Sequence, residues 1–330
     1  MNQLSFVDAY RTFPYILTEG AIVERLRHEF HIPLDEHLVH AALIYDDAHR
    51  DTLAGLYKQY IDIAASHDLP LMLMTPTRRA NVENIAVSAY RNRSVIPDNV
   101  RFLLQLRASA LSPVYIGGLA GCRGDAYDGR YHFSVEEAMQ FHYPTVRAMA
   151  EAGVDFLFAG IMPQLTETIG MANAMAATGL PYIISFMVRR DGRLMDGTFI
   201  HDAIDTVDKE TTTRPLCYMA NCVHPDVLHQ ALSHPRNDTF LVRERFRGIQ
   251  ANASALSPEE LNGRTDLLSS SPDELSDRLM TLLWDFPLKI CGGCCGTNEQ
   301  HLRNFAEMLT LNSVPTVSYT HLTLPTKLEV

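Results

Sequence analysis

Two adjacent cysteines, Cys294 and Cys295, lie in the segment 289–297, KICGGCCGT. A third cysteine, Cys222, ends the apolar segment 216–222. Cysteine thiolates are preferred ligands of zinc, which usually has four ligands in a tetrahedral arrangement. Two neighbouring residues can bind one ion only if the backbone turns sharply, and the flanking glycines allow such a turn. The three cysteines are therefore a candidate zinc site with one position still to be filled.

The fourth ligand decides what kind of zinc site this is. An open position is typical of a catalytic zinc, whereas His224, two residues after Cys222, would close a structural Cys3His site. Structural sites usually have close ligand pairs such as C-x2-C at both ends, and Cys222 has no such neighbour. The spacing favours the open site, with His224 near the start of a helix. We expect the remaining cysteines to be small buried side chains: Cys122, Cys217 and Cys291.

The composition limits the cellular setting and the partners. The chain has 330 residues, 46% hydrophobic and 20% charged, which is typical of globular proteins. Its net charge of −11 provides no basic surface for nucleic acid or an anionic membrane. No apolar run approaches the ~18 residues of a membrane span, and no secretion signal begins the sequence. We expect a cytoplasmic protein that uses cysteines for metal binding or catalysis rather than for disulfides.

Short apolar segments alternate with longer segments of helical periodicity. One of the latter, 134–153, opens with a capping-box pattern of Ser134 and Glu137 and ends with Gly153. The apolar segments suit strands buried on both faces of a parallel sheet. There are eight of them: 13–18, 69–75, 113–118, 154–160, 181–188, 216–222, 246–252 and 287–293.

Eight strand–helix repeats predict a single-domain (β/α)8 barrel over residues 1–315. Such barrels typically take about 250 residues, so we expect insertions within 29–66 and 78–109. The polar segment 258–274 is expected to be an exposed loop before the last strand. The tail 316–330, TVSYTHLTLPTKLEV, is expected to be non-native or disordered, with no part in the function.

In such a barrel the chemistry lies at the rim where the strands end and the βα-loops begin. Cys222 ends the sixth predicted strand, Asn252 ends the seventh, and Cys294 and Cys295 follow the eighth. The barrel would therefore bring all three cysteines to one rim.

Four segments of the chain, in order, resemble the homocysteine S-methyltransferase family, and the resemblance extends from about residue 17 to 311. They are GGLAGCRGDAY (117–127), EEAMQFHYPTVRAMAEAGVDFL (136–157), ANCVHP (220–225) and GGCCGTNEQHLRNF (292–305). The resemblance implies a barrel in which Cys222, Cys294 and Cys295 bind Zn²⁺, with Asn252 beside the open zinc position.

The activity implied is methyl transfer to a thiol, homocysteine or a related one, in methionine biosynthesis. Zinc lowers the pKa of a bound thiol, so that the nucleophilic thiolate forms at neutral pH. The resemblance favours a small onium donor of the S-methylmethionine type, and homo-oligomer formation stays open. We expect Glu19, Thr75, Asn221 and Asn252 to bind substrate. The alternative is a barrel that retains zinc without turnover and acts as a ligand-binding or interaction protein.

The resemblance is weakest where the family binds the amino group of homocysteine. Thr18 replaces an aspartate after the first strand, although Glu19 follows it. After the fourth strand, Ala159, Gly160 and Ile161 occupy the region where the family has a glutamate. After the second strand the chain has Arg78 and Arg79, which either face the site or point to solvent. Because a buried ammonium needs an anion, we expect homocysteine to be a poorer acceptor than a thiol that lacks the ammonium or carries an extra carboxylate for Arg78 or Arg79.

Overall fold

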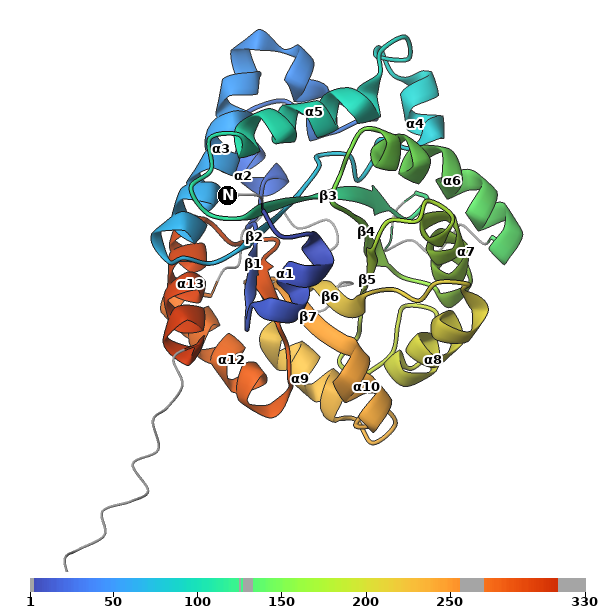
Figure 1. Cartoon of the computed structure of the whole chain (residues 1–330), viewed down its shortest axis with the longest axis vertical. Coiled ribbons are helices and arrows are strands. Elements are labelled where there is room, and N and C mark those ends of the chain that lie inside the picture. The colour runs from blue at the N-terminus through green and yellow to red at the C-terminus, as the bar shows by residue number, and fades with distance from the viewer. Residues whose placement is uncertain (1–2, 125, 127–132, 256–269, 314–330) are drawn as a thin grey trace, which may run out of the picture.

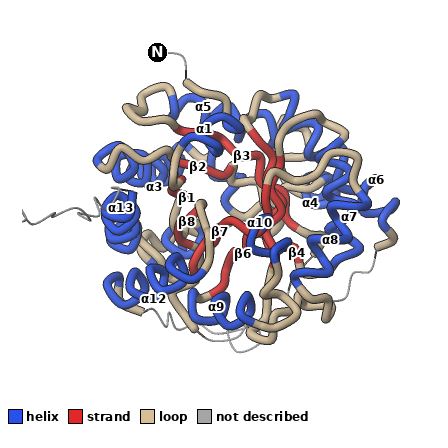
Figure 2. Tube along the Cα trace, turned by 60° about the horizontal axis from the view of Figure 1, so that its bottom comes forward, coloured by secondary structure: helices blue, strands red, loops and turns tan. Residues whose placement is uncertain are grey.

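Eight parallel strands close into a barrel, and helices surround it (Figure 1, Figure 2). The computed structural model describes residues 3–124, 126, 133–255 and 270–313. Each strand pairs with the next one along the chain, and the last pairs with the first. The strands are β1 Ile16–Thr18, β2 Leu71–Met74, β3 Val114–Gly121, β4 Phe156–Met162, β5 Tyr182–Phe186, β6 Cys217–Val223, β7 Phe246–Ala251 and β8 Ile290–Gly293. Each overlaps a predicted segment, and the predicted (β/α)8 barrel is confirmed.

The helices outside the barrel include α2 Val23–His28, α3 Asp47–Ser66, α4 Val82–Val87, α5 Val95–Arg107, α6 Val135–Glu151, α7 Leu165–Ala176, α8 Ile200–Glu210, α9 Pro225–Ser233, α10 Phe240–Arg245, α12 Pro272–Asp285 and α13 Glu299–Ser313. The predicted capping box of α6 is present, with Ser134 and Glu137 each accepting the other's backbone N–H. A 3-10 helix, η1 His40–Tyr45, precedes α3 in the first segment with an expected insertion. None of the described helices is long and apolar enough to cross a membrane.

Two predicted segments fall largely or wholly outside the described residues. Of the polar loop 258–274, the structure describes 270–274, where α12 begins after its cap Ser271. The tail 316–330 lies outside the described residues.

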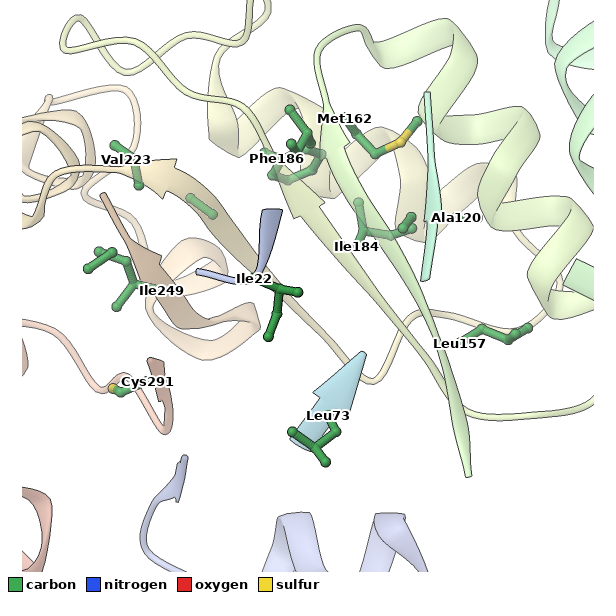
Figure 3. Close-up of a cluster of buried hydrophobic side chains, with 14 of the residues drawn as sticks. Ile22, Leu73, Ala120, Leu157, Met162, Ile184, Phe186, Val223, Ile249 and Cys291 are labelled. Carbon is green, nitrogen blue, oxygen red and sulfur yellow. The ribbon is translucent and has the colours of Figure 1, made fainter. Parts of the chain in front are cut away.

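The strands are buried on both faces, as a parallel sheet requires. Side chains inside the barrel, such as Met72 and Phe156, form one apolar cluster. Side chains between the strands and the helices form a second, and Figure 3 shows ten labelled members of it. Cys217 belongs to the inner cluster and Cys291 to the outer one. Both are buried, as is Cys122, which confirms the prediction for these three cysteines.

A short N-terminal helix, α1 Phe6–Thr12, packs against the inner cluster and lies in front of the barrel in Figure 1. The ring of Phe6 stacks on Phe156 with 4.1 Å between centroids and lies 5.5 Å from Tyr115. The helix covers one end of the barrel, a contact that no local pattern in the sequence indicates. The opposite end, where the carboxyl ends of the strands meet, is left for the functional site.

Candidate metal centre

Cys222 reaches the rim of the barrel from an irregular strand end. The pairing of β6 with β7 shifts register between Asn221 and Val223, and Cys222 has φ of 58°. This left-handed conformation is uncommon for residues other than glycine and costs on the order of 1–3 kcal/mol. A bulge of this kind changes the direction of a side chain. It allows Asn221 and Cys222, consecutive residues of one strand, both to line the same cavity.

Cys294 and Cys295 lie in the turn after β8, and this turn requires its glycines. A Cβ atom at Gly293 would collide with the side chain of Thr297, and Gly296 has φ of 76°. The turn is fixed to β7 because the Cys294 N–H donates to the Ala251 carbonyl at 2.7 Å. The predicted sharp turn is therefore present, and it leaves both thiols at the rim.

The three thiols converge on one point. Cys222 Sγ lies 3.0 Å from Cys294 Sγ and 3.2 Å from Cys295 Sγ, and the latter two are 4.0 Å apart. A tetrahedral zinc with Zn–S bonds of about 2.3 Å would hold its sulfurs about 3.8 Å apart. All three cysteines are free of disulfides. We call this group the cysteine triad. Its sulfurs are close enough together to bind one metal ion, and the two shorter separations would have to widen by about 0.6–0.8 Å around zinc.

The three thiols of the triad do not ionise equally. Hydrogen bonds from Cys294 and Cys295 hold the pKa of Cys222 well below the usual thiol range. The same hydrogen bonds to Cys222 raise the pKa of Cys294 and of Cys295 well above that range. One thiolate therefore forms readily, and its charge opposes the next. A metal cation would allow all three to ionise.

Within the described part of the chain, no histidine, aspartate or glutamate has a ligand atom within 4.8 Å of all three sulfurs. The nearest approach is the Glu24 carboxylate, which accepts a hydrogen bond from the Cys295 thiol alone. His224 instead caps α9, where its Nδ1 accepts the Asp226 N–H at 3.2 Å. This agrees with the predicted place of His224 at a helix start, and His224 is not a member of the triad.

A cavity of about 260 Å³ adjoins the triad. All three cysteines line it, and so do three of the four residues expected to bind substrate: Glu19, Thr75 and Asn221. Asn252 is buried but is not among the lining residues, and its Oδ1 accepts the Ser254 N–H at 2.8 Å. Its expected place beside the open metal position stays a prediction.

Glu19 is a buried carboxyl group without a cationic partner among the described residues. Its Oε2 accepts the Met74 N–H at 2.7 Å. Burial raises the pKa of Glu19 to about 8, and only that hydrogen bond opposes the rise. At pH 7 most Glu19 side chains are therefore protonated.

Thr75 and Asn221 hold the cavity wall together. Thr75 Oγ1 accepts the Leu119 N–H at 2.9 Å and lies 2.7 Å from Thr77 Oγ1. Asn221 Oδ1 accepts hydrogen bonds from the Ile161 N–H and from the Ser185 hydroxyl. These atoms are occupied within the protein, so both residues position the wall as well as line it.

The cavity contains three ionisable residues that sequence reasoning missed: Glu24, Arg27 and His40. The Glu24 carboxylate accepts hydrogen bonds from the Gly296 N–H and the Cys295 thiol, so it adjoins the triad. Glu24 and Arg27 are charged residues three positions apart, just after the first strand. This place near a strand end is the sequence signal that could have marked them as site residues. His40 follows in η1, and nothing in its sequence context marked it.

Arg78 and Arg79 have different surroundings. Arg78 lines the cavity, and its charge helps to lower the pKa of Cys222 after the larger effect of the thiol hydrogen bonds. Arg79 is not among the lining residues and donates to the Gly124 carbonyl at 2.7 Å. Of the two arginines noted in the sequence, Arg78 belongs to the site.

Comparison with known proteins leads to one family. A family model described as homocysteine S-methyltransferase matches residues 16–309. The chain is 35% identical over 82 residues to the homocysteine S-methyltransferase of Escherichia coli (strain K12), covering 24% of this chain and 26% of that protein. It is 24% identical over 188 residues to homocysteine S-methyltransferase YbgG of Bacillus subtilis (strain 168), covering 56% of each. The matches thus span about a quarter and about half of these relatives' lengths.

Among solved structures, the chain is similar to the metallated form of the homocysteine methyltransferase MmuM from Escherichia coli. The TM-score is 0.70 at 20% identity, covering 90% of this chain and 97% of that one. At this identity the likeness concerns the fold.

Proposed function

Because this chain belongs to the homocysteine S-methyltransferase family, we propose that it transfers a methyl group from a small onium donor to a thiol acceptor. The observation that carries the proposal is the convergence of three unbridged thiols, 3.0–4.0 Å apart, at a cavity. Cys222, Cys294 and Cys295 would hold zinc there. When bound, zinc lowers the pKa of an acceptor thiol and so supplies a thiolate nucleophile at neutral pH.

The substrates then complete the reaction between them. The acceptor sulfur attacks the donor's methyl carbon, a new S–C bond forms, and the donor's own bond to that carbon breaks. A sulfonium donor such as S-methylmethionine leaves as a neutral thioether, taking the electron pair. The thiol proton is released when the thiolate forms, so no side chain must act as a general base. If homocysteine is the acceptor, the product belongs to methionine biosynthesis.

The cavity residues bind and orient the acceptor. Leu119, Phe158 and Ile161 provide apolar walls beside the reacting sulfur. Glu19 is the group that would meet an acceptor ammonium, after losing its proton. Asn221 holds the Ile161 backbone in place, and Asn252 would lie near the open metal position.

The alternative function is a barrel that retains zinc without turnover and binds a ligand or partner. A closed Cys3His site would favour it. The role of His224 as the cap of α9 favours the enzyme instead.

The decisive test is a methyl-transfer assay with zinc-loaded protein and mass-spectrometric detection of the methylated thiol. S-Methylmethionine, S-adenosylmethionine and betaine would be offered as donors to a panel of small thiols. We expect turnover with S-methylmethionine and none after Cys222→Ala. Full zinc occupancy without turnover for any pair would support the binding protein and contradict this proposal.

A further inference from the structure

The cavity has a cationic side that the methyl-transfer reaction does not itself require. Arg27, Arg78 and His40 all line it. Neither guanidinium group has a hydrogen-bond or ion-pair partner among the residues that the structure describes. By contrast, Arg25 pairs with Glu29 at 2.9 Å and with Glu299 at 2.7 Å.

His40 shows that these groups lie close together. The residue is 8% exposed, and its Nδ1 is buried without a hydrogen-bond partner. Burial, followed by the charges of Arg78 and Arg27, lowers the pKa of His40 to about 3. Both guanidinium groups thus act on one neutral imidazole ring. A neutral imidazole still carries one N–H, which can donate to an anion.

The acids of the cavity do not neutralise this cationic side. Glu24 is engaged by the Gly296 N–H and the Cys295 thiol. Glu19 is held by the Met74 N–H, and no arginine contributes to its pKa. Arg27 is exposed and its charge is partly screened by solvent, so the half-buried Arg78 is the stronger cationic group of the cavity. A half-buried cation facing a cavity is best satisfied by an anionic ligand group.

We propose that Arg78, with His40 and Arg27, forms an anion subsite that binds a carboxylate of the acceptor thiol. This rests on the proposed function, because it assigns the acceptor to the cavity beside the triad. One cavity of about 260 Å³ is lined by both the triad and Arg78, so a short acceptor can place its sulfur at the first and its carboxylate at the second. The acceptor class is a small mercaptocarboxylate.

The test compares two acceptors that differ only in the charged group, 3-mercaptopropionate and 3-mercaptopropan-1-ol. With zinc-loaded protein and S-methylmethionine, we expect kcat/KM to favour the carboxylate by about tenfold to a hundredfold, the range of a charge-assisted hydrogen bond. The preference should lie mainly in KM, because the carboxylate is remote from the reacting sulfur and is bound equally throughout the reaction.

Arg78→Met should abolish this preference, and Arg78→Lys should restore part of it by returning the charge. Arg79→Met is the matched control, since Arg79 is adjacent in sequence but is not among the lining residues. It should leave the preference unchanged. Equal use of both acceptors by the unmodified protein, or equal loss in the Arg78 and Arg79 variants, would overturn the subsite.

Calorimetric titration with the thioethers 3-(methylthio)propionate and 3-(methylthio)propan-1-ol separates this inference from the proposed function. These compounds need no turnover. If no thiol is methylated but the carboxylate thioether binds in an Arg78-dependent manner, the proposed function fails and the subsite stands. If thiols are methylated but the two thioethers bind with equal affinity, with or without Arg78, the subsite fails and the function stands.

Discussion

Asn221 Oδ1 accepts the Ile161 backbone N–H at 2.9 Å, which connects the irregular ends of two barrel strands. Ile161 has φ of 56° where β4 shifts register against β5, and Cys222, next to Asn221, has φ of 58°. One buried amide thus joins the cavity wall to the strand end that carries a cysteine of the triad.

Asn221→Leu should therefore destabilise the protein and weaken metal binding together. The substitution leaves the Ile161 N–H and the Ser185 hydroxyl without their acceptor, at a cost of about 1–3 kcal/mol for a buried group. Urea unfolding and zinc titration measure the two effects. Asn221→Asp keeps an acceptor oxygen and is the control. A Leu variant with unchanged stability and zinc affinity would show that this hydrogen bond does not support the site.

Cys222→Ala should lose most bound zinc and all methyl transfer while keeping the fold, because the barrel core consists of other residues. Atomic absorption measures the bound zinc, and circular dichroism measures whether the fold is kept. Cys291→Ala is the matched control, since Cys291 is buried outside the barrel wall and should retain zinc. Full zinc occupancy after Cys222→Ala would refute the assignment of the triad.

Gly293→Ala should abolish zinc binding through the backbone alone. The added Cβ would collide with Thr297 and displace the turn that carries Cys294 and Cys295. Gly55→Ala is a suitable control, because a Cβ there meets nothing within 4 Å and Gly55 lies inside α3. The control should stabilise the protein by about 1 kcal/mol. Zinc content is the measurement, and normal occupancy in the Gly293 variant would contradict the role of the turn.

Glu19→Gln should stabilise the protein at pH 8 more than at pH 5. The folded-state pKa of Glu19 is about 8, whereas an unfolded glutamate has 4.5. Between these values the folded state retains a proton that the unfolded state has lost, so stability falls as pH rises, by about 1.4 kcal/mol per unit at most. The glutamine side chain does not titrate, so the variant lacks this loss of stability. Thermal melts of both proteins from pH 5 to pH 8 measure the effect. A stability difference between the two proteins that does not change with pH would contradict the raised pKa.

Homocysteine should be a poorer acceptor than 3-mercaptopropionate at pH 7 and should improve as pH approaches 8. Its ammonium needs an anion, and Glu19 is mostly protonated at pH 7. Thiol ionisation also rises with pH, so the homocysteine rate is divided by the 3-mercaptopropionate rate at each pH as the control. Steady-state kinetics at both pH values give the comparison. A homocysteine kcat/KM of about 10⁴ M⁻¹s⁻¹ or above at pH 7, within the ordinary range of enzymes, would contradict this prediction.

The sequence predicted the barrel and the triad because both depend on short-range patterns. Apolar segments of strand length, separated by helical periodicity, specify where β1 to β8 form. Once parallel strands close into a barrel, their carboxyl ends must meet at one rim. Residues that end two strands, such as Cys222 and Cys294, then converge whatever their separation in sequence.

The tertiary structure alone decided which other side chains reach the cavity. His40 and Arg27 come from segments between β1 and β2 whose course depends on packing rather than on periodicity. Of two adjacent arginines, Arg78 lines the cavity and Arg79 does not, and no local pattern distinguishes them. The bulge at Cys222 and the contact of α1 with the barrel end likewise arise from long-range contacts. The periodicity of a sequence segment reflects the helix or strand that the segment itself forms. The placements named above depend instead on how elements distant in sequence pack against each other.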